Sequence, residues 1–190
     1  PSSSAPILCD VTGRRVWTGN PDSNTISALN ADTLSKTAEF PTCADPRAIA
    51  RTPGGQLWVA CHDDDRIRIH NEVTGAVIDT LDTGYGSAPI GVALSPDGAT
   101  AYVALAQRGE LRRYNTATRQ QTGVLALGPQ PRGIAVSADG ARVLVSRFLS
   151  PLHHGEVWDV NAANMSLTRV IRIPKFGDEA NRDTTASGRG

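Results

Sequence analysis

Two stretches of the sequence concentrate the side chains that could do chemistry. The first is "HDDD" at positions 62–65, and the second is "SRFLSPLHHGEVW" at positions 146–158. Imidazole and carboxylate groups can bind a metal ion or exchange protons, whereas guanidinium groups bind anions and stack on aromatic rings. The residues that we single out as a ligand or partner surface are His62, Asp63, Asp64, Arg147, Phe148, His153 and His154.

The spacing of these residues matches no common catalytic or metal-binding motif. The sequence has no HxH or HExxH pair and no GxSxG turn, and its acidic run lacks the glycine and the final glutamate of a calcium loop. We therefore assign no catalytic residue, no metal ligand and no cofactor. A zinc site that joins His62 and the carboxylates beside it to His153 or His154 remains the alternative.

The elements that must position these side chains repeat about every forty residues. Repeat units start at Pro6, Pro46, Pro89 and Pro131, at spacings of 40, 43 and 42 residues. Each unit has an early turn glycine, a late turn asparagine and, between them, a large apolar residue that we expect in the core: Trp17, Trp58, Tyr102 or Leu144. Short strands joined by such turns at this period are typical of β-propeller blades. We predict an all-β fold of four-stranded antiparallel blades at 6–45, 46–88, 89–130 and 131–173, with a lead at 1–5 and a polar linker at 174–190.

The third unit carries the residues that suggest a family. The turn "SPDG" at 95–98, the strand "AYVA" at 101–104 and then Leu111, Asn115 and Thr118 resemble the YVTN-type β-propeller repeat. Such repeats usually build seven-bladed propellers in exported proteins, some of them fused to c-type cytochrome or other enzyme domains. The resemblance therefore implies part of a ring of about seven blades in a periplasmic or extracellular protein. We expect its signal peptide to lie outside this chain.

Four blades of a larger ring leave the outer faces of the first and last blades uncovered. A propeller avoids exposed sheet edges by closing its ring, often with a strand that one terminus lends to the other. We expect further blades of the natural chain to close the ring, and residues 1–5 to be too few for a lent strand. A second copy of the chain and tight closure of the four blades on one another are the alternatives.

The two candidate stretches lie on the same end of the predicted blades. This end, the loop face, carries the loop into each first strand and the hairpin between each second and third strand. The hairpin spans nine residues from Trp17 to Ile26 and equally in the next two units, but thirteen from Leu144 to Val157. Insertions in the loops of repeat proteins often build binding sites. We predict that the loop face binds a protein or a small-molecule ligand.

The three cysteines allow one disulfide. The first two strands of the second unit pair around its turn glycine, so Cys61 should lie opposite Pro46 or Arg47, close to Cys43. We predict a Cys43–Cys61 bond, which favours an oxidising compartment, and a buried, free Cys9. Two independent buried thiols are the alternative.

Composition excludes some classes of partner. The 19 basic residues balance the 19 acidic residues, so no net field favours nucleic acid, and no apolar run is long enough for membrane insertion. We predict a non-catalytic scaffold or recognition module of an exported protein. The alternative is the propeller portion of an enzyme, either a redox protein with a fused c-type cytochrome domain or a lyase- or lactonase-type propeller.

Overall fold

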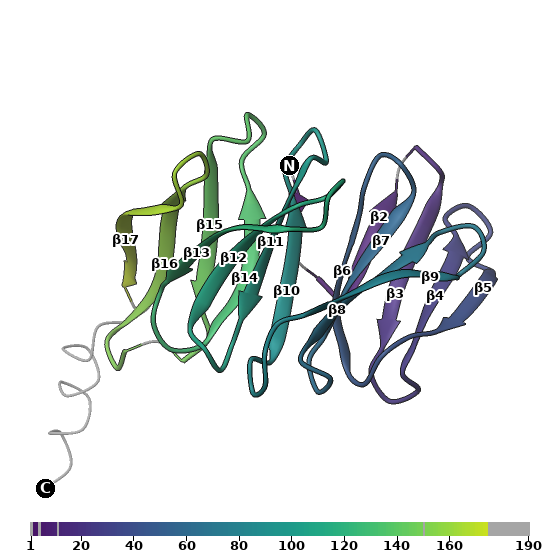
Figure 1. The fold of residues 1–190 in the computed structure, drawn as a ribbon, viewed down its shortest axis with the longest axis horizontal. Coiled ribbons are helices and arrows are strands. Elements are labelled where there is room, and N and C mark those ends of the chain that lie inside the picture. The colour runs from purple at the N-terminus through teal and green to yellow at the C-terminus, as the bar shows by residue number, and fades with distance from the viewer. Residues whose placement is uncertain (1, 4, 11, 150, 175–190) are drawn as a thin grey trace, which may run out of the picture.

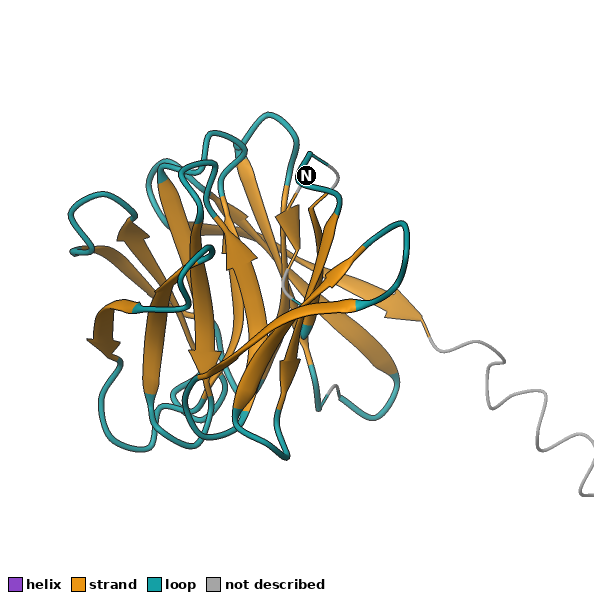
Figure 2. Ribbon diagram, turned by 90° about the vertical axis from the view of Figure 1, so that its right-hand side faces the viewer, coloured by secondary structure: helices purple, strands orange, loops and turns teal. Residues whose placement is uncertain are grey.

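The computed structural model describes residues 2–3, 5–10, 12–149 and 151–174, which form four antiparallel sheets side by side (Figure 1). No helix occurs among these residues, so none of the described chain forms a helix able to cross a membrane. The loops gather at two opposite ends of the sheets, as Figure 2 shows. The all-β prediction is confirmed.

Each sheet keeps the order of its strands in the sequence. The first sheet contains β2 (Ile7–Asp10), β3 (Arg15–Asn20), β4 (Thr25–Asn30) and β5 (Lys36–Pro41). The second contains β6 (Pro46–Arg51), β7 (Gln56–Cys61), β8 (Arg66–Asn71) and β9 (Val77–Asp82). The third contains β10 (Pro89–Leu94), β11 (Thr100–Leu105), β12 (Glu110–Asn115) and β13 (Gln121–Ala126). The fourth contains β14 (Pro131–Val136), β15 (Arg142–Arg147), β16 (His154–Asn161), β17 (Ser166–Pro174) and, beside β14, β1 (Ser2–Ser3).

The repeated turn residues shape the hairpins at the end opposite the loop face. In the third sheet, the carboxylate of Asp97 accepts hydrogen bonds from Ser95 Oγ and Ala99 N, and Gly98 has a φ of 71°. The side chain of Asn115 accepts hydrogen bonds from the N–H groups of the two residues at 117–118. These local bonds end the strands at fixed points, and the same asparagine turn recurs in the other sheets.

The core consists of apolar layers between neighbouring sheets. Trp17 and Trp58 are fully buried, and Tyr102 nearly so, because each is covered by the next sheet. Leu144, at the same repeat position in the fourth sheet, is only half-buried because no described sheet covers it. On the other outer face, Ile7 is 59% exposed. The two outer faces are therefore open, and the four sheets do not close on one another.

The residues before the first unit correct one expectation. β1 pairs with the inner strand β14 through Ser2↔Val136 and Ser3↔Ala135, so even this short lead adds a strand to another sheet. The carbonyl of Ala5 accepts a hydrogen bond from Ile49 N. The lead therefore meets the unpaired inner edges of the second and fourth sheets, where free backbone groups can still accept partners.

The cysteines bear out one prediction and contradict another. Cys61 lies opposite Pro46, and the Cys43–Cys61 disulfide is present with its Cα atoms 5.5 Å apart. Cys9 is free, as predicted, but exposed rather than buried. Cys9 lies on β2, in the open outer face of the first sheet. The equivalent residue of the fourth sheet, Val136, is buried because the third sheet covers it.

Candidate functional site

A pocket of about 150 Å³ lies on the loop face, where loops of the second, third and fourth sheets meet. Its lining combines apolar, aromatic and polar side chains. They belong to His62, Ile90, Ala106, Gln107, Gln130, Pro131, Arg132 and Phe148. Two of the predicted surface residues, His62 and Phe148, thus line the same pocket although 86 positions separate them in the sequence.

Three repeat positions supply most of this lining. The pairs Pro46↔Cys61, Pro89↔Leu105 and Pro131↔Arg147 place the three sheets in a common register. We name the positions pre-proline, post-proline and hairpin, the last being the residue that follows the second strand. They hold Asp45, Arg47 and His62 in the second sheet, Ala88, Ile90 and Ala106 in the third, and Gln130, Arg132 and Phe148 in the fourth.

The backbone at the pre-proline position is the same in all three sheets. Asp45, Ala88 and Gln130 have φ values of 54°, 50° and 56°, which are uncommon for residues with a side chain. A register shift follows each proline, at Pro46, Pro89 and Pro131. This constant backbone sets the start of each inner strand, so the chemistry at the pre-proline and post-proline positions differs through their side chains.

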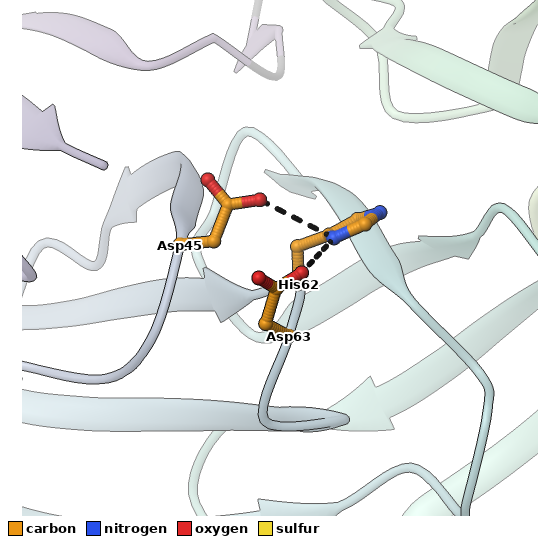
Figure 3. A group of neighbouring side chains, drawn as sticks. All are labelled: Asp45, His62 and Asp63. Atoms are coloured by element: carbon orange, nitrogen blue, oxygen red, sulfur yellow. Dashed lines mark hydrogen bonds and ion pairs between the residues drawn. The ribbon is translucent and has the colours of Figure 1, made fainter. Parts of the chain in front are cut away.

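In the second sheet, the side chains at the three positions contact one another. Asp45 Oδ2 lies 2.7 Å from Arg47 Nε and 3.3 Å from His62 Nδ1. Asp63 Oδ1 lies 2.7 Å from the same Nδ1, so both carboxylates meet one ring nitrogen and the other points away (Figure 3). Carboxylates only accept hydrogen bonds, so Nδ1 carries a hydrogen, and in the uncharged form of the ring Nε2 is an acceptor.

The same atoms have the ligand types of a cation site. One ligand atom each from Asp45, His62 and Asp63 lie within 4.8 Å of one another. Arg47, however, already pairs with the carboxylate of Asp45 and places a positive charge beside the group. We therefore assign no metal here.

In the fourth sheet, the corresponding residues leave a cation without a carboxylate. The guanidinium carbon of Arg132 lies 4.1 Å from the centre of the Phe148 ring, a cation–π contact. Gln130, a neutral residue, stands where the second sheet has Asp45. Among the described residues, Arg132 forms no ion pair. The third sheet contributes only Ala88, Ile90 and Ala106 at these positions, and these small or apolar residues leave room for the pocket.

The carboxylates of the acidic run brace the loops rather than line the pocket. Asp64 Oδ2 accepts a hydrogen bond from Ala44 N at 3.0 Å. The carboxylate of Asp65 accepts hydrogen bonds from Gly86 N and Ala88 N. Burial raises the pKa of Asp65, but these backbone donors outweigh it and hold the pKa below its ordinary value. The ionised side chain thus ties the second sheet to the loop that enters the third.

The remaining predicted residues form a separate group, which we call the Glu156 cluster: Arg147, His154 and Glu156. Glu156 Oε2 lies 2.6 Å from Arg147 Nη1, and Oε1 lies 3.1 Å from His154 Nε2. The hydrogen bond from Arg147 is the main reason that the pKa of Glu156 falls below its ordinary value. His154 begins β16, whereas His153 is exposed in the turn before it. None of these residues lines the pocket.

The sequence interpretation did not single out Arg132, Gln130 or Asp45. Each occupies a position fixed by the repeat, one residue before or after the proline that starts a unit. Aligning these positions across units would have shown an arginine with an acidic neighbour in one unit and a neutral neighbour in another. The pocket itself could not be read in this way because it depends on how three sheets are placed in space.

Comparisons with known proteins place the fold. No family model and no curated protein matches the sequence. Among solved structures, hydrazine synthase of Kuenenia stuttgartiensis matches with a TM-score of 0.82 and 21% identity over 92% of this chain and 51% of that one. A protein from Lactobacillus plantarum matches with a TM-score of 0.72 and 22% identity over 92% of this chain and 58% of that one. A candidate 6-phosphogluconolactonase from Bacteroides fragilis matches with a TM-score of 0.70 and 17% identity, again over 92% of this chain and 58% of that one. The chain has the fold of β-propeller blades and spans between half and three fifths of the length of these structures.

Proposed function

We propose that the chain is four blades of a YVTN-type β-propeller in an exported protein, and that these blades form a non-catalytic recognition module. Its binding site is the pocket on the loop face. The supporting observation is the convergence of three successive sheets, with His62 from the second, Ile90 from the third and Arg132 over the Phe148 ring from the fourth. A concave site with apolar walls and a few placed polar groups suits a small ligand or one side chain of a partner.

A fragment screen followed by 15N-edited NMR tests this function. We expect ligands that bind to shift the amide signals of Gln107, Arg132 and Phe148, and to leave those of the opposite end, such as Gly98 and Gly140, unchanged. Phe148→Ala should weaken these ligands, whereas Phe40→Ala, an aromatic substitution in the first sheet outside the pocket, should not. A screen with no fragment bound at the pocket would argue against the recognition module.

Further blades are the partner that we propose for the two outer faces. Ile7 and Cys9 are exposed in the first sheet, whereas Ile134 and Val136, at the same positions of the fourth, are buried by the third sheet. In a complete ring of about seven blades, a neighbouring blade would cover Cys9 and slow its reaction with a maleimide. In the 190-residue chain alone, Cys9 should react as fast as a thiol in a denatured control. Protection that rises with the concentration of this chain would instead favour closure by a second copy.

The disulfide supports the exported location, because such bonds persist in oxidising compartments. Thiol counting under denaturing, non-reducing conditions should find one free thiol, that of Cys9. Three free thiols in protein isolated from its natural compartment would contradict both the bond and the location.

A second candidate function is that the chain forms the propeller portion of an enzyme, and one observation favours it. The imidazole of His62 is held at Nδ1 by two carboxylates, which is how a general base is oriented. The solved structures that resemble the chain include hydrazine synthase and a candidate lactonase, so the enzyme could be a lactonase-type propeller or a redox protein with a cytochrome domain. A lactone hydrolysis that His62→Gln abolishes, while Arg47→Gln leaves it intact, would favour this candidate over the recognition module.

A further inference from the structure

We propose that the pocket selects small organic carboxylates that carry a hydroxyl group beside the carboxylate; this rests on the proposed recognition function. In this arrangement, Arg132 pairs with the carboxylate and Nε2 of His62 accepts a hydrogen bond from the hydroxyl. The apolar part of the ligand lies against Ile90, Ala106 and Phe148, which line the same pocket.

Arg132 is suited to a planar anion. Its guanidinium carbon lies 4.1 Å from the centre of the Phe148 ring, and no described residue accepts a hydrogen bond from its N–H groups. No carboxylate of the described residues pairs with it, in contrast to Arg47 with Asp45 and Arg142 with Asp159. A carboxylate matches this planar fork with two parallel hydrogen bonds.

His62 supplies the second contact. Asp45 and Asp63 fix a hydrogen on Nδ1, so whenever the ring is uncharged its acceptor is Nε2, which lies on the other side of the ring (Figure 3). A ligand hydroxyl can satisfy this acceptor, whereas a second carboxylate oxygen cannot. The histidine therefore discriminates between a hydroxy acid and a plain acid.

The charges around the pocket favour a single negative charge on the ligand. Of the described residues that line the pocket, only Arg132 carries a permanent charge, and this single positive charge matches a monocarboxylate. A phosphate carries about two negative charges at neutral pH, so one of them would stay unmatched. Phosphate should therefore bind more weakly than the carboxylate.

The volume limits the size of the ligand. A cavity of about 150 Å³ is large enough for a molecule such as benzene, which has six heavy atoms. Lactate, also with six heavy atoms, fits this limit. A carboxylate with a nearby hydroxyl could come from a free hydroxy acid or, with the hydroxyl one carbon further away, from the end of a peptide with a C-terminal serine.

NMR titrations with matched probes test the proposal. We expect lactate to bind about tenfold more tightly than lactamide, which lacks the charge, and severalfold more tightly than propionate, which lacks the hydroxyl. Inorganic phosphate should bind more weakly than lactate. A short peptide ending in serine, compared with its C-terminal amide, distinguishes a peptide source from a free acid.

Two variants assign the contacts. Arg132→Gln should lose about tenfold in lactate affinity, whereas Arg47→Gln, at the same repeat position in the second sheet, should lose little. His62→Phe should bring lactate and propionate to equal affinity while both still exceed lactamide. Equal binding of lactate and lactamide, or an unchanged affinity in Arg132→Gln, would overturn the proposal. If fragments of another charge class bind the pocket and lactate does not, the carboxylate selectivity fails while the recognition function stands.

Discussion

The second and fourth sheets use the same three loop positions for opposite purposes. In the second sheet, Asp45 holds both Arg47 and His62, so that the cluster is internally paired. In the fourth sheet, Gln130 replaces the carboxylate, and Arg132 is left with an aromatic ring as its only described partner. The pre-proline φ is the same in both, so the change from the acid Asp45 to the amide Gln130, together with that from His62 to Phe148, separates a structural cluster from a candidate binding group.

The two sheets also differ in what holds the hairpin beside these positions. Cys61 ends β7 and is bonded to Cys43, whereas Arg147 ends β15 at the same position and pairs with Glu156. A covalent bond resists acid but not reductants, and the ion pair has the reverse properties. The loops that surround the pocket are thus held by two braces of different chemistry.

Removal of the disulfide should have the largest effect. The variant Cys43→Ala/Cys61→Ala opens a bond that spans 18 residues, and we expect the free energy of unfolding to fall by about 3 kcal/mol. The matched change in the fourth sheet, Arg147→Ala/Glu156→Ala, should cost only about 1 kcal/mol. Denaturant titrations of both variants, with Cys9→Ser as the thiol control, measure the difference. Equal losses would mean that the braces are equivalent.

A swap at the pre-proline position should erase the difference in binding. Gln130→Asp gives Arg132 the carboxylate that Arg47 has, so we expect the affinity for lactate to fall about tenfold with little change in stability. Gln130→Asn keeps the amide and serves as the control. An unchanged affinity in Gln130→Asp would show that the pairing of this arginine does not decide binding.

Acid should weaken the brace of the fourth sheet before that of the second. Because Arg147 lowers the pKa of Glu156 in the folded protein, the stability from this pair is full above about pH 4.3 and disappears as the pH falls through the lower, folded pKa. The difference in unfolding free energy between the wild type and Glu156→Gln should therefore shrink from pH 6 toward about pH 3. The loss caused by Cys43→Ala/Cys61→Ala should stay constant over the same range. A constant difference for Glu156→Gln would contradict the assignment of this brace.

The features that the sequence predicted correctly depend on local patterns. Glycine and asparagine turns end the strands, and the alternation of side chains fixes the register, so the position of Cys61 opposite Pro46 followed from counting. The disulfide followed from that register. Trp17 and Trp58 are buried as expected, because every sheet except the last is covered by the next one.

The features that the sequence missed depend on which sheets are neighbours in space. Cys9 is exposed because its face of the first sheet has no described neighbour, although Leu94 and Val136, at its position in the third and fourth sheets, are buried. The lead pairs with β14 because that inner edge is free, which no local pattern encodes. Arg132 belongs to the pocket only because the third sheet holds Ile90 and Ala106 between the other two.

Removal of the aromatic ring beside Arg132 should have the smallest effect on binding. Phe148 occupies the hairpin position that His62 has in the second sheet, and its ring fixes the guanidinium at 4.1 Å. Phe148→Leu keeps an apolar wall but removes the cation–π contact, which is worth about 0.5–1 kcal/mol at an exposed site. We expect the affinity for lactate to fall by a factor of about two to five, and the preference for lactate over propionate to stay, because His62 sets that preference. A change in the preference instead would mean that the ring, and not the histidine, positions the hydroxyl group.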